Sequence, residues 1–141
     1  MTHIATALRT STDATIRASA AVVAAFAPSG VRLYPLAAPT NPAFPYVIYR
    51  VEIVGDDTEC AEGAEAYLVL DVYAREATYL ASVEKAEAIT GASRTALVRA
   101  LPLVDHKVDD WEFEADRPVS DPDVLTEHRN VRIRYLTTAT A

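Results

Sequence analysis

The chain has 141 residues, of which 50% are hydrophobic and 23% charged, so we expect one folded domain over residues 1–141 and exclude a largely disordered chain. Thirteen Lys and Arg against 20 Asp and Glu give a formal charge of −7, which argues against a free-standing nucleic-acid binder. The single cysteine, Cys60, excludes an intramolecular disulfide and a cysteine-rich zinc site.

The first 27 residues predict helix. Alanine is the best helix former, and apolar residues recur at roughly helical spacing between Ile4 and Phe26. The hydroxyl-rich residues 11–13 interrupt this pattern and could cap a second helix, so we expect a short helix followed by a longer one, or one broken helix. The apolar run at residues 20–27 is too short to span a membrane, and its low hydrophobicity favours an amphipathic helix over a secretory signal.

Three strands are expected next. Residues 31–34 predict a short strand, and a proline-rich irregular segment follows it. Residues 46–54 predict a strand with Arg50 and Glu52 on one face and apolar side chains on the other. Residues 66–75 predict a strand with apolar residues on both faces, which indicates an interior strand or a face covered by a partner chain.

A second main helix is predicted over residues 78–101, ending at Pro102. Its apolar stripe comprises Leu80, Val83, Ala86, Ile89, Ser93, Ala96, Leu97 and Ala100.

Two strands at residues 108–115 and 129–136 are expected to pair around a long polar loop. Alternation places Trp111, Phe113 and Ala115 on one face of the first strand and its acidic residues on the other. In an antiparallel pair these acids would oppose the arginines of the second strand. The order helix, strand, strand, strand, helix, strand, strand predicts an α+β domain with a mainly antiparallel sheet and two main helices.

The sequence patterns do not indicate an enzyme. The chain has no Gly-x-Ser-x-Gly elbow, and its four glycines are scattered. His106 and His128 lie near carboxylates, but neither has a second histidine at helical or strand spacing, so we interpret them as strand-end residues. The acidic neighbours of Cys60 disfavour its thiolate. We therefore predict no catalytic residue, no metal site and no cofactor.

Several segments are informative when they are taken together and in order. An alanine-rich N-terminal helix precedes Gly-Val-Arg-Leu-Tyr at residues 30–34 and a proline-rich loop. Ala-Phe-Pro-Tyr-Val-Ile at residues 43–48 is the most characteristic stretch, and residues 70–75 follow an acidic turn. An alanine-rich helix, a Trp/Phe strand and residues 128–135 complete the series. This order resembles the phage tail completion family, whose members are tail terminator proteins of long-tailed bacteriophages and gene transfer agents.

The resemblance implies a structural virion protein that needs no covalent chemistry. Tail terminators build a ring, usually of six subunits, on the end of the tail tube. The ring stops tube polymerisation and joins the tail to the head or neck, and DNA passes through its channel. The resemblance thus implies a homo-oligomer with the tail tube protein and a neck protein as partners, no specific DNA binding and no membrane, assembled in the host cytoplasm.

Two sets of residues are candidates for the contacts of such a ring. Acidic loops at residues 55–63 and 117–128 are candidates to face the channel or the tube end, where negative charge would repel DNA, or are plain solvated loops. The two-sided strand 66–75 is a candidate for subunit contact or an ordinary core strand. The loop candidates are Asp56, Asp57, Glu59, Glu62, Arg117, Asp121, Asp123 and Glu127. The interface candidates are Tyr67, Val69, Asp71, Tyr73, Arg132 and Arg134.

Two alternative functions remain open. A head-closure, or stopper, protein of the neck would also form a ring, but on the portal side. A small cytosolic α+β binding module or dimeric enzyme would instead be a monomer or dimer with a ligand pocket.

Overall fold

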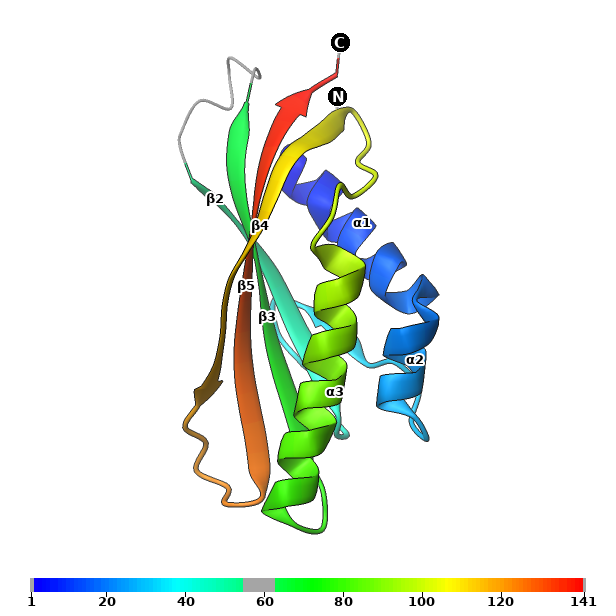
Figure 1. Ribbon diagram of the computed structural model, residues 1–141, viewed down its shortest axis with the longest axis vertical. Coiled ribbons are helices and arrows are strands. Elements are labelled where there is room, and N and C mark those ends of the chain that lie inside the picture. The colour runs from blue at the N-terminus through cyan, green and yellow to red at the C-terminus, as the bar shows by residue number, and fades with distance from the viewer. Residues whose placement is uncertain (1, 55–62, 141) are drawn as a thin grey trace.

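One layer of helices packs on one face of a five-stranded sheet in the computed structural model, which describes residues 2–54 and 63–140 (Figure 1). The strand order is β1-β2-β3-β5-β4, with β1 parallel to β2 and every other pair antiparallel. This confirms the predicted α+β class. No helix within the described residues is long and apolar enough to cross a membrane. The elements are α1 (Ile4–Ala18), α2 (Ala20–Phe26), β1 (Leu33–Pro35), β2 (Tyr46–Val54), β3 (Ala64–Arg75), α3 (Tyr79–Leu97), β4 (His106–Val119) and β5 (Thr126–Ala139).

The N-terminal helix breaks at Ser19, and the break expected at residues 11–13 is wrong. Ser19 has an extended backbone, and its Oγ accepts a hydrogen bond from the Val22 N–H at 3.3 Å, which caps α2. The side chain of Asp13 is engaged elsewhere, with Arg17 (2.7 Å) and with the Tyr49 hydroxyl (3.2 Å). Packing of α1 on the sheet and on α3 therefore overrides the local tendency of residues 11–13 to start a helix.

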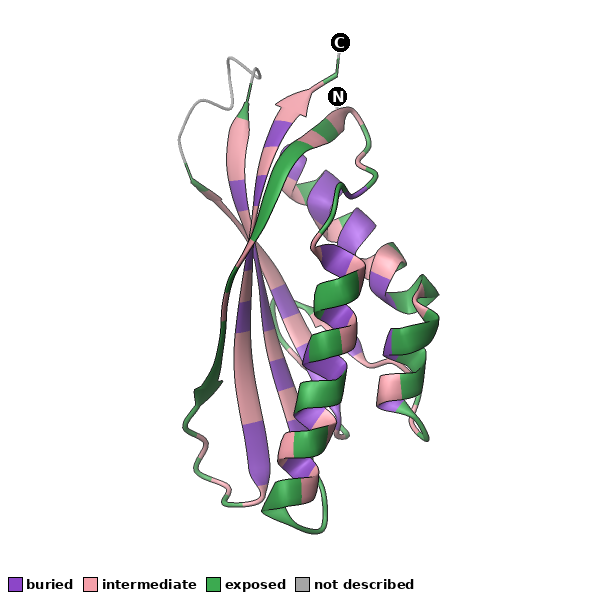
Figure 2. Ribbon diagram, in the orientation of Figure 1, coloured by how far each residue is buried: buried purple, intermediate pink, exposed green. Residues whose placement is uncertain are grey.

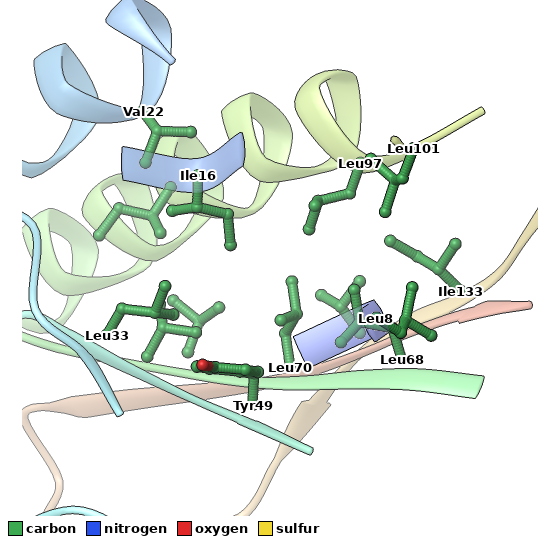
Figure 3. Close-up of a cluster of buried hydrophobic side chains, with 14 of the residues drawn as sticks. Leu8, Ile16, Val22, Leu33, Tyr49, Leu68, Leu70, Leu97, Leu101 and Ile133 are labelled. Carbon is green, nitrogen blue, oxygen red and sulfur yellow. The ribbon is translucent and has the colours of Figure 1, made fainter. Parts of the chain in front are cut away.

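The core lies between the helices and the covered face of the sheet (Figure 3). Leu68 and Leu70 of the central strand β3 are fully buried and face Leu8 and Ile16 of α1 and Leu97 of α3. Together with Val72 they form the apolar row that the alternation of residues 66–75 predicted. The interior position of β3 explains why this strand is apolar on both faces.

Helix α3 starts at its Thr78 cap as predicted but ends at Leu97, four residues before the predicted end. The Thr78 Oγ1 accepts from the Ala81 N–H at 3.2 Å. Leu80 is 68% exposed, so its predicted place in the buried stripe is wrong. The buried side of α3 consists of Ser82, Ala86, Ile89, Thr90, Ser93 and Leu97.

The hairpin of β4 and β5 is longer than predicted, and residues 120–125 alone connect the two strands. Arg117 lies in β4 opposite Asn130, and Glu127 lies in β5, so their assignment to a loop is wrong. Pro118 does not end β4, which is consistent with the position of this strand at the edge of the sheet, where proline is tolerated.

The predicted alternation of β4 holds only up to a bulge between Phe113 and Ala115. Beyond the bulge, Ala115 pairs with Arg132, which points away from the helices. Ala115 therefore does not share a face with Trp111 and Phe113, contrary to the prediction.

Candidate functional site: the uncovered face of the sheet

The two faces of the sheet have different surroundings. All three helices lie on one side, and the described residues place no helix on the other (Figure 1). Strand alternation and register bring the six predicted interface residues together on this uncovered side. We call this surface the open face. Its residues are Arg50 and Glu52 of β2, Glu65, Tyr67, Val69, Asp71 and Tyr73 of β3, His128, Asn130, Arg132 and Arg134 of β5, and Glu112 and Glu114 of β4.

Asp71 is the centre of a hydrogen-bond network on the open face. Its Oδ2 accepts from Arg50 Nη1 at 3.0 Å, and its Oδ1 lies 2.9 Å from both His128 Nε2 and Asn130 Nδ2. An ionised carboxylate has no hydrogen to give, so His128 donates through Nε2. The side chains of Asp71 and His128 are 13% and 14% exposed, so neighbouring side chains hold the network in place.

Aromatic rings continue this network toward β2. The Tyr73 ring stacks on the His128 ring at 4.1 Å and on the Tyr46 ring at 4.8 Å between centroids. Burial, followed by the negative charge of Asp71, raises the pKa of Tyr73 to about 12. The phenol of Tyr73 therefore stays neutral at physiological pH.

Two arginines of β5 each bind carboxylates from two other strands. Arg132 Nε lies 3.2 Å from Glu114 and its Nη1 3.7 Å from Glu52, while its Cζ sits 3.9 Å from the centre of the Tyr67 ring. Arg134 Nε lies 2.9 Å from Glu65, and its Nη1 lies 3.5 Å from Glu112.

The expected charge pairing between the last two strands is thereby confirmed for Glu112 and Glu114. Asp116 lies beyond the bulge, and it binds Arg129 on the helix side at 2.9 Å instead. Glu65 also accepts a hydrogen bond from the Tyr67 hydroxyl, and this bond, followed by that of Arg134, lowers the pKa of Glu65.

The open face presents charges that are fixed in position by their partners. Each of its arginines is bound to two carboxylates, so the charges are fixed in position and largely compensated. Over residues 2–54 and 63–140, no group of three His, Cys, Asp or Glu side chains is placed to hold a metal ion. A preformed pattern of paired charges and stacked rings can be complementary to a protein surface.

Sequence reasoning identified six residues of this face and missed others. Alternation had placed Arg50 and Glu52 together on one side of their strand, which was a usable signal. His128 was interpreted as a strand-end residue, whereas it binds Asp71 and stacks on Tyr73. The register that joins β2, β3 and β5 has no sequence signal, so these partners could not be assigned in advance.

The predictions for the residues of the two contact loops have different outcomes. Asp121 and Asp123 lie in the β4–β5 turn as expected. Asp123 accepts from the Leu125 N–H (3.0 Å) and from Arg75 (2.6 Å), and these bonds, in that order, lower its pKa. Glu127 is buried in β5, where its carboxylate accepts from the hydroxyl of Tyr79 at 3.0 Å. The remaining candidates, Asp56, Asp57, Glu59 and Glu62, lie outside the described residues. Cys60 also lies outside them.

Comparisons with known proteins agree with this architecture. The family described as "Tail completion protein gp17" matches residues 13–138, which is most of the chain. A solved chain from "Virion of native gene transfer agent (GTA) particle" shares the fold with a TM-score of 0.76 and 22% identity, over 99% of this chain and 100% of that one. No curated protein matches significantly. The chain therefore belongs to the tail completion protein gp17 family, as its sequence predicted, and is a structural protein of a phage tail.

Proposed function

We propose that the protein is a tail terminator of the virion. Six subunits form a ring on the end of the tail tube, stop tube polymerisation and join the tail to the neck. The observation that carries this proposal is the match to the tail completion family over residues 13–138. The fold of a chain from a gene transfer agent virion supports it. The work of such a protein lies in its interfaces, and it requires neither a cofactor nor covalent chemistry.

The open face supplies one side of the contact between neighbouring subunits. Covering a surface that carries single charges is costly, because each charge loses its water. On the open face, Arg132 and Arg134 already have carboxylate partners, and Val69 is 2% exposed. A neighbouring subunit can therefore cover this face without leaving unpaired charges.

The turn between β4 and β5 contacts the tail tube or the neck protein. Its backbone is held by Asp123, which binds Arg75 across the end of the sheet, and by Asp121, which accepts from the Asp123 N–H at 2.9 Å. Val124 at its tip is 82% exposed. A turn that is fixed in shape and ends in an apolar side chain loses little conformational entropy on docking.

The charge of the assembly suits the passage of DNA. Six subunits at −7 each carry a formal charge of about −42. Carboxylates that face the channel repel the phosphates, so the duplex passes without binding to the wall.

Light scattering on the purified protein across a concentration series tests the proposal. The expected species is near 92 kDa, six times the subunit mass of 15.3 kDa. A central channel should then appear in negative-stain micrographs. If the protein is monomeric alone, it is expected to cap one end of purified tail tubes that were assembled without heads. A concentration-independent dimer that does not bind tubes would contradict the proposal, and a ring that binds portal assemblies but not tubes would identify a stopper instead.

A further inference from the structure

Positive charge is concentrated at the N-terminal end of the chain. Residues 1–48 contain three arginines and one acid, Asp13, which gives +2, whereas residues 49–141 contain ten basic and 19 acidic residues, which gives −9. The three arginines are Arg9 and Arg17 of α1 and Arg32 just before β1. We call this set the basic flank.

Contacts place the basic flank at the β1 edge of the sheet. Arg17 Nη2 donates to the Leu33 carbonyl of β1 at 3.2 Å. Arg32 comes directly before β1, and its Nη1 donates to the Phe44 carbonyl at 2.7 Å. Arg17 and Arg32 therefore lie at the β1 edge, and Arg9 lies eight residues, about two helical turns, before Arg17 on α1.

The opposite edge of the sheet is acidic. Strand β4 carries five acids, Asp109, Asp110, Glu112, Glu114 and Asp116, against Lys107 and Arg117, which gives −3 for the strand itself. Four of these acids are bound to Lys107 or to arginines of β5, and Asp110 has no cationic partner among the described residues. Ten of its fourteen residues are exposed, whereas β2 and β3 have one exposed residue each and β5 has none (Figure 2). We call β4 the acidic strand.

Each edge also presents a large apolar side chain. Trp111 in the middle of the acidic strand is 41% exposed, and Leu36 directly after β1 is 69% exposed. Tryptophan is enriched among the residues that dominate binding energy in protein interfaces. Opposite edges with opposite charge and exposed apolar residues meet the requirement of a closed ring, whose head-to-tail contact joins two different surfaces of the same chain.

We propose that the acidic strand of one subunit docks on the basic flank of the next subunit, with Trp111 buried at the contact. This inference rests on the ring of the proposed function and extends its subunit contact from the open face to the two edges of the sheet. The contact is made by side chains rather than by extension of the sheet. The acidic strand carries two irregularities, at Val108/Asp110 and Phe113/Ala115, as well as Pro118, and such features protect an edge from main-chain pairing.

Trp111 is the chain's single tryptophan, so its fluorescence reports directly on the proposed contact. In the wild type, the emission maximum is expected to shift to shorter wavelength over the concentration range in which the mass rises from 15.3 kDa to the ring. An emission maximum that stays constant while the ring forms would overturn the proposal, because Trp111 would then lie outside the contact.

Charge reversal tests the pairing of the two edges. Asp110 and Arg9 suit this test because their hydrogen bonds are to nearby residues of the same element: Asp110 accepts from the Trp111 N–H at 2.9 Å, and Arg9 donates to the Thr6 hydroxyl at 3.4 Å. Asp110→Lys and Arg9→Asp are each expected to raise the concentration needed for half-assembly at least tenfold, and the double variant is expected to recover most of this loss. Glu87→Lys on the exposed side of α3 is the control, with the same change of charge and an unchanged ring.

The outcomes separate the two proposals. If the wild type forms no ring alone or on tail tubes, the proposed function fails. If the wild type forms a ring but Asp110→Lys and Arg9→Asp assemble like Glu87→Lys, the ring stands and this contact is wrong. Far-UV circular dichroism and urea unfolding of each variant show whether loss of assembly is due to loss of folding instead. Recovery in the double variant is the result that a folding defect would not produce.

Discussion

The two faces of β3 show how one strand serves two purposes. Leu68, Leu70 and Val72 point to the helices and are fully buried among apolar side chains. On the other face, Asp71 and Tyr73 are held by hydrogen bonds and by ring stacking. The covered face gains its free energy from removing apolar area from water, which needs good packing. The open face depends on paired polar groups, which fix positions and contribute less to stability.

Leu70→Ala should disrupt packing on the covered face and have the largest effect on the free energy of unfolding. Leu70 is fully buried in the central strand, so its truncation leaves a cavity, and the free energy of unfolding should fall by about 3 kcal/mol. Urea denaturation measures the change. Val124→Ala, at a position that is 82% exposed, is the matched control and should stay within about 0.5 kcal/mol of the wild type. Equal effects of the two substitutions would contradict the proposed location of the core.

Asp71→Ala should break the open face with a smaller effect. Removal of this carboxylate leaves the donors of Arg50, His128 and Asn130 without their shared acceptor. We expect the free energy of unfolding to fall by about 2 kcal/mol. Asp71→Asn retains one acceptor oxygen and should lose less. If Asp71→Ala unfolds at the wild-type urea concentration, the network does not contribute to stability.

Two buried serines of α3 show how a polar side chain affects stability on the covered side of the sheet. Ser93 is 1% exposed, and its hydroxyl has no hydrogen-bond partner among the described residues. Ser93→Ala should raise the free energy of unfolding by about 0.5 kcal/mol, since alanine is the better helix former. Ser82 is equally buried, but its hydroxyl binds the Glu76 N–H (2.8 Å) and the Thr78 carbonyl (3.1 Å), so Ser82→Ala should cost about 1 kcal/mol.

Calorimetric or urea unfolding of both variants measures the two changes in the free energy of unfolding, which are expected to have opposite signs. A loss above about 1 kcal/mol for Ser93→Ala would mean that a bound water satisfies the hydroxyl, and the predicted sign would then be wrong.

Protonation of Glu65 at low pH should reduce the stability that the open face contributes, and this effect should be the smallest. The bond from Tyr67, followed by that from Arg134, holds the pKa of Glu65 below its usual value of 4.5. A carboxylate whose pKa is lowered by folding stabilises the protein above its unfolded pKa, and this stability is lost as the pH falls through the folded pKa. Wild type should therefore be more stable than Glu65→Gln at pH 7, and the difference should shrink as the pH falls below 4.5 and through the lowered pKa of Glu65. A difference that is constant between pH 7 and pH 3 would exclude this origin.

The covered face was largely predictable from sequence, and the open face was predictable only in part. Burial follows from alternation within one strand, so Leu68, Leu70 and Val72 could be assigned from their spacing. The same alternation found Tyr67, Val69, Asp71 and Tyr73 on the other side, although not their partners. The bond between Asp71 and His128 joins residues 57 positions apart, and it depends on the register of β3 with β5, which no local pattern encodes.

The errors have the same physical origin. The break at Ser19 and the continuation of β4 past Arg117 were both decided by packing against other elements rather than by local propensity. Residues 11–13 are good caps in isolation, and Pro118 is a good strand terminator in isolation. The first tendency was overridden by packing of α1 on the sheet and on α3. The second had no effect because β4 lies at the edge of the sheet.

The position of β5 has a consequence for how the chain folds. Strand β5 is the last element of the sequence, yet it is an interior strand that joins β3 to β4 and carries the fully buried Val131, Ile133 and Tyr135. The β2–β3 hairpin forms from nearby residues, but the sheet closes only when Thr137 pairs with Ala64, 73 positions earlier. The sheet therefore stays incomplete until β5 has been synthesised, and the edge strand β4, whose neighbour in the sheet is β5, joins the other strands only through it.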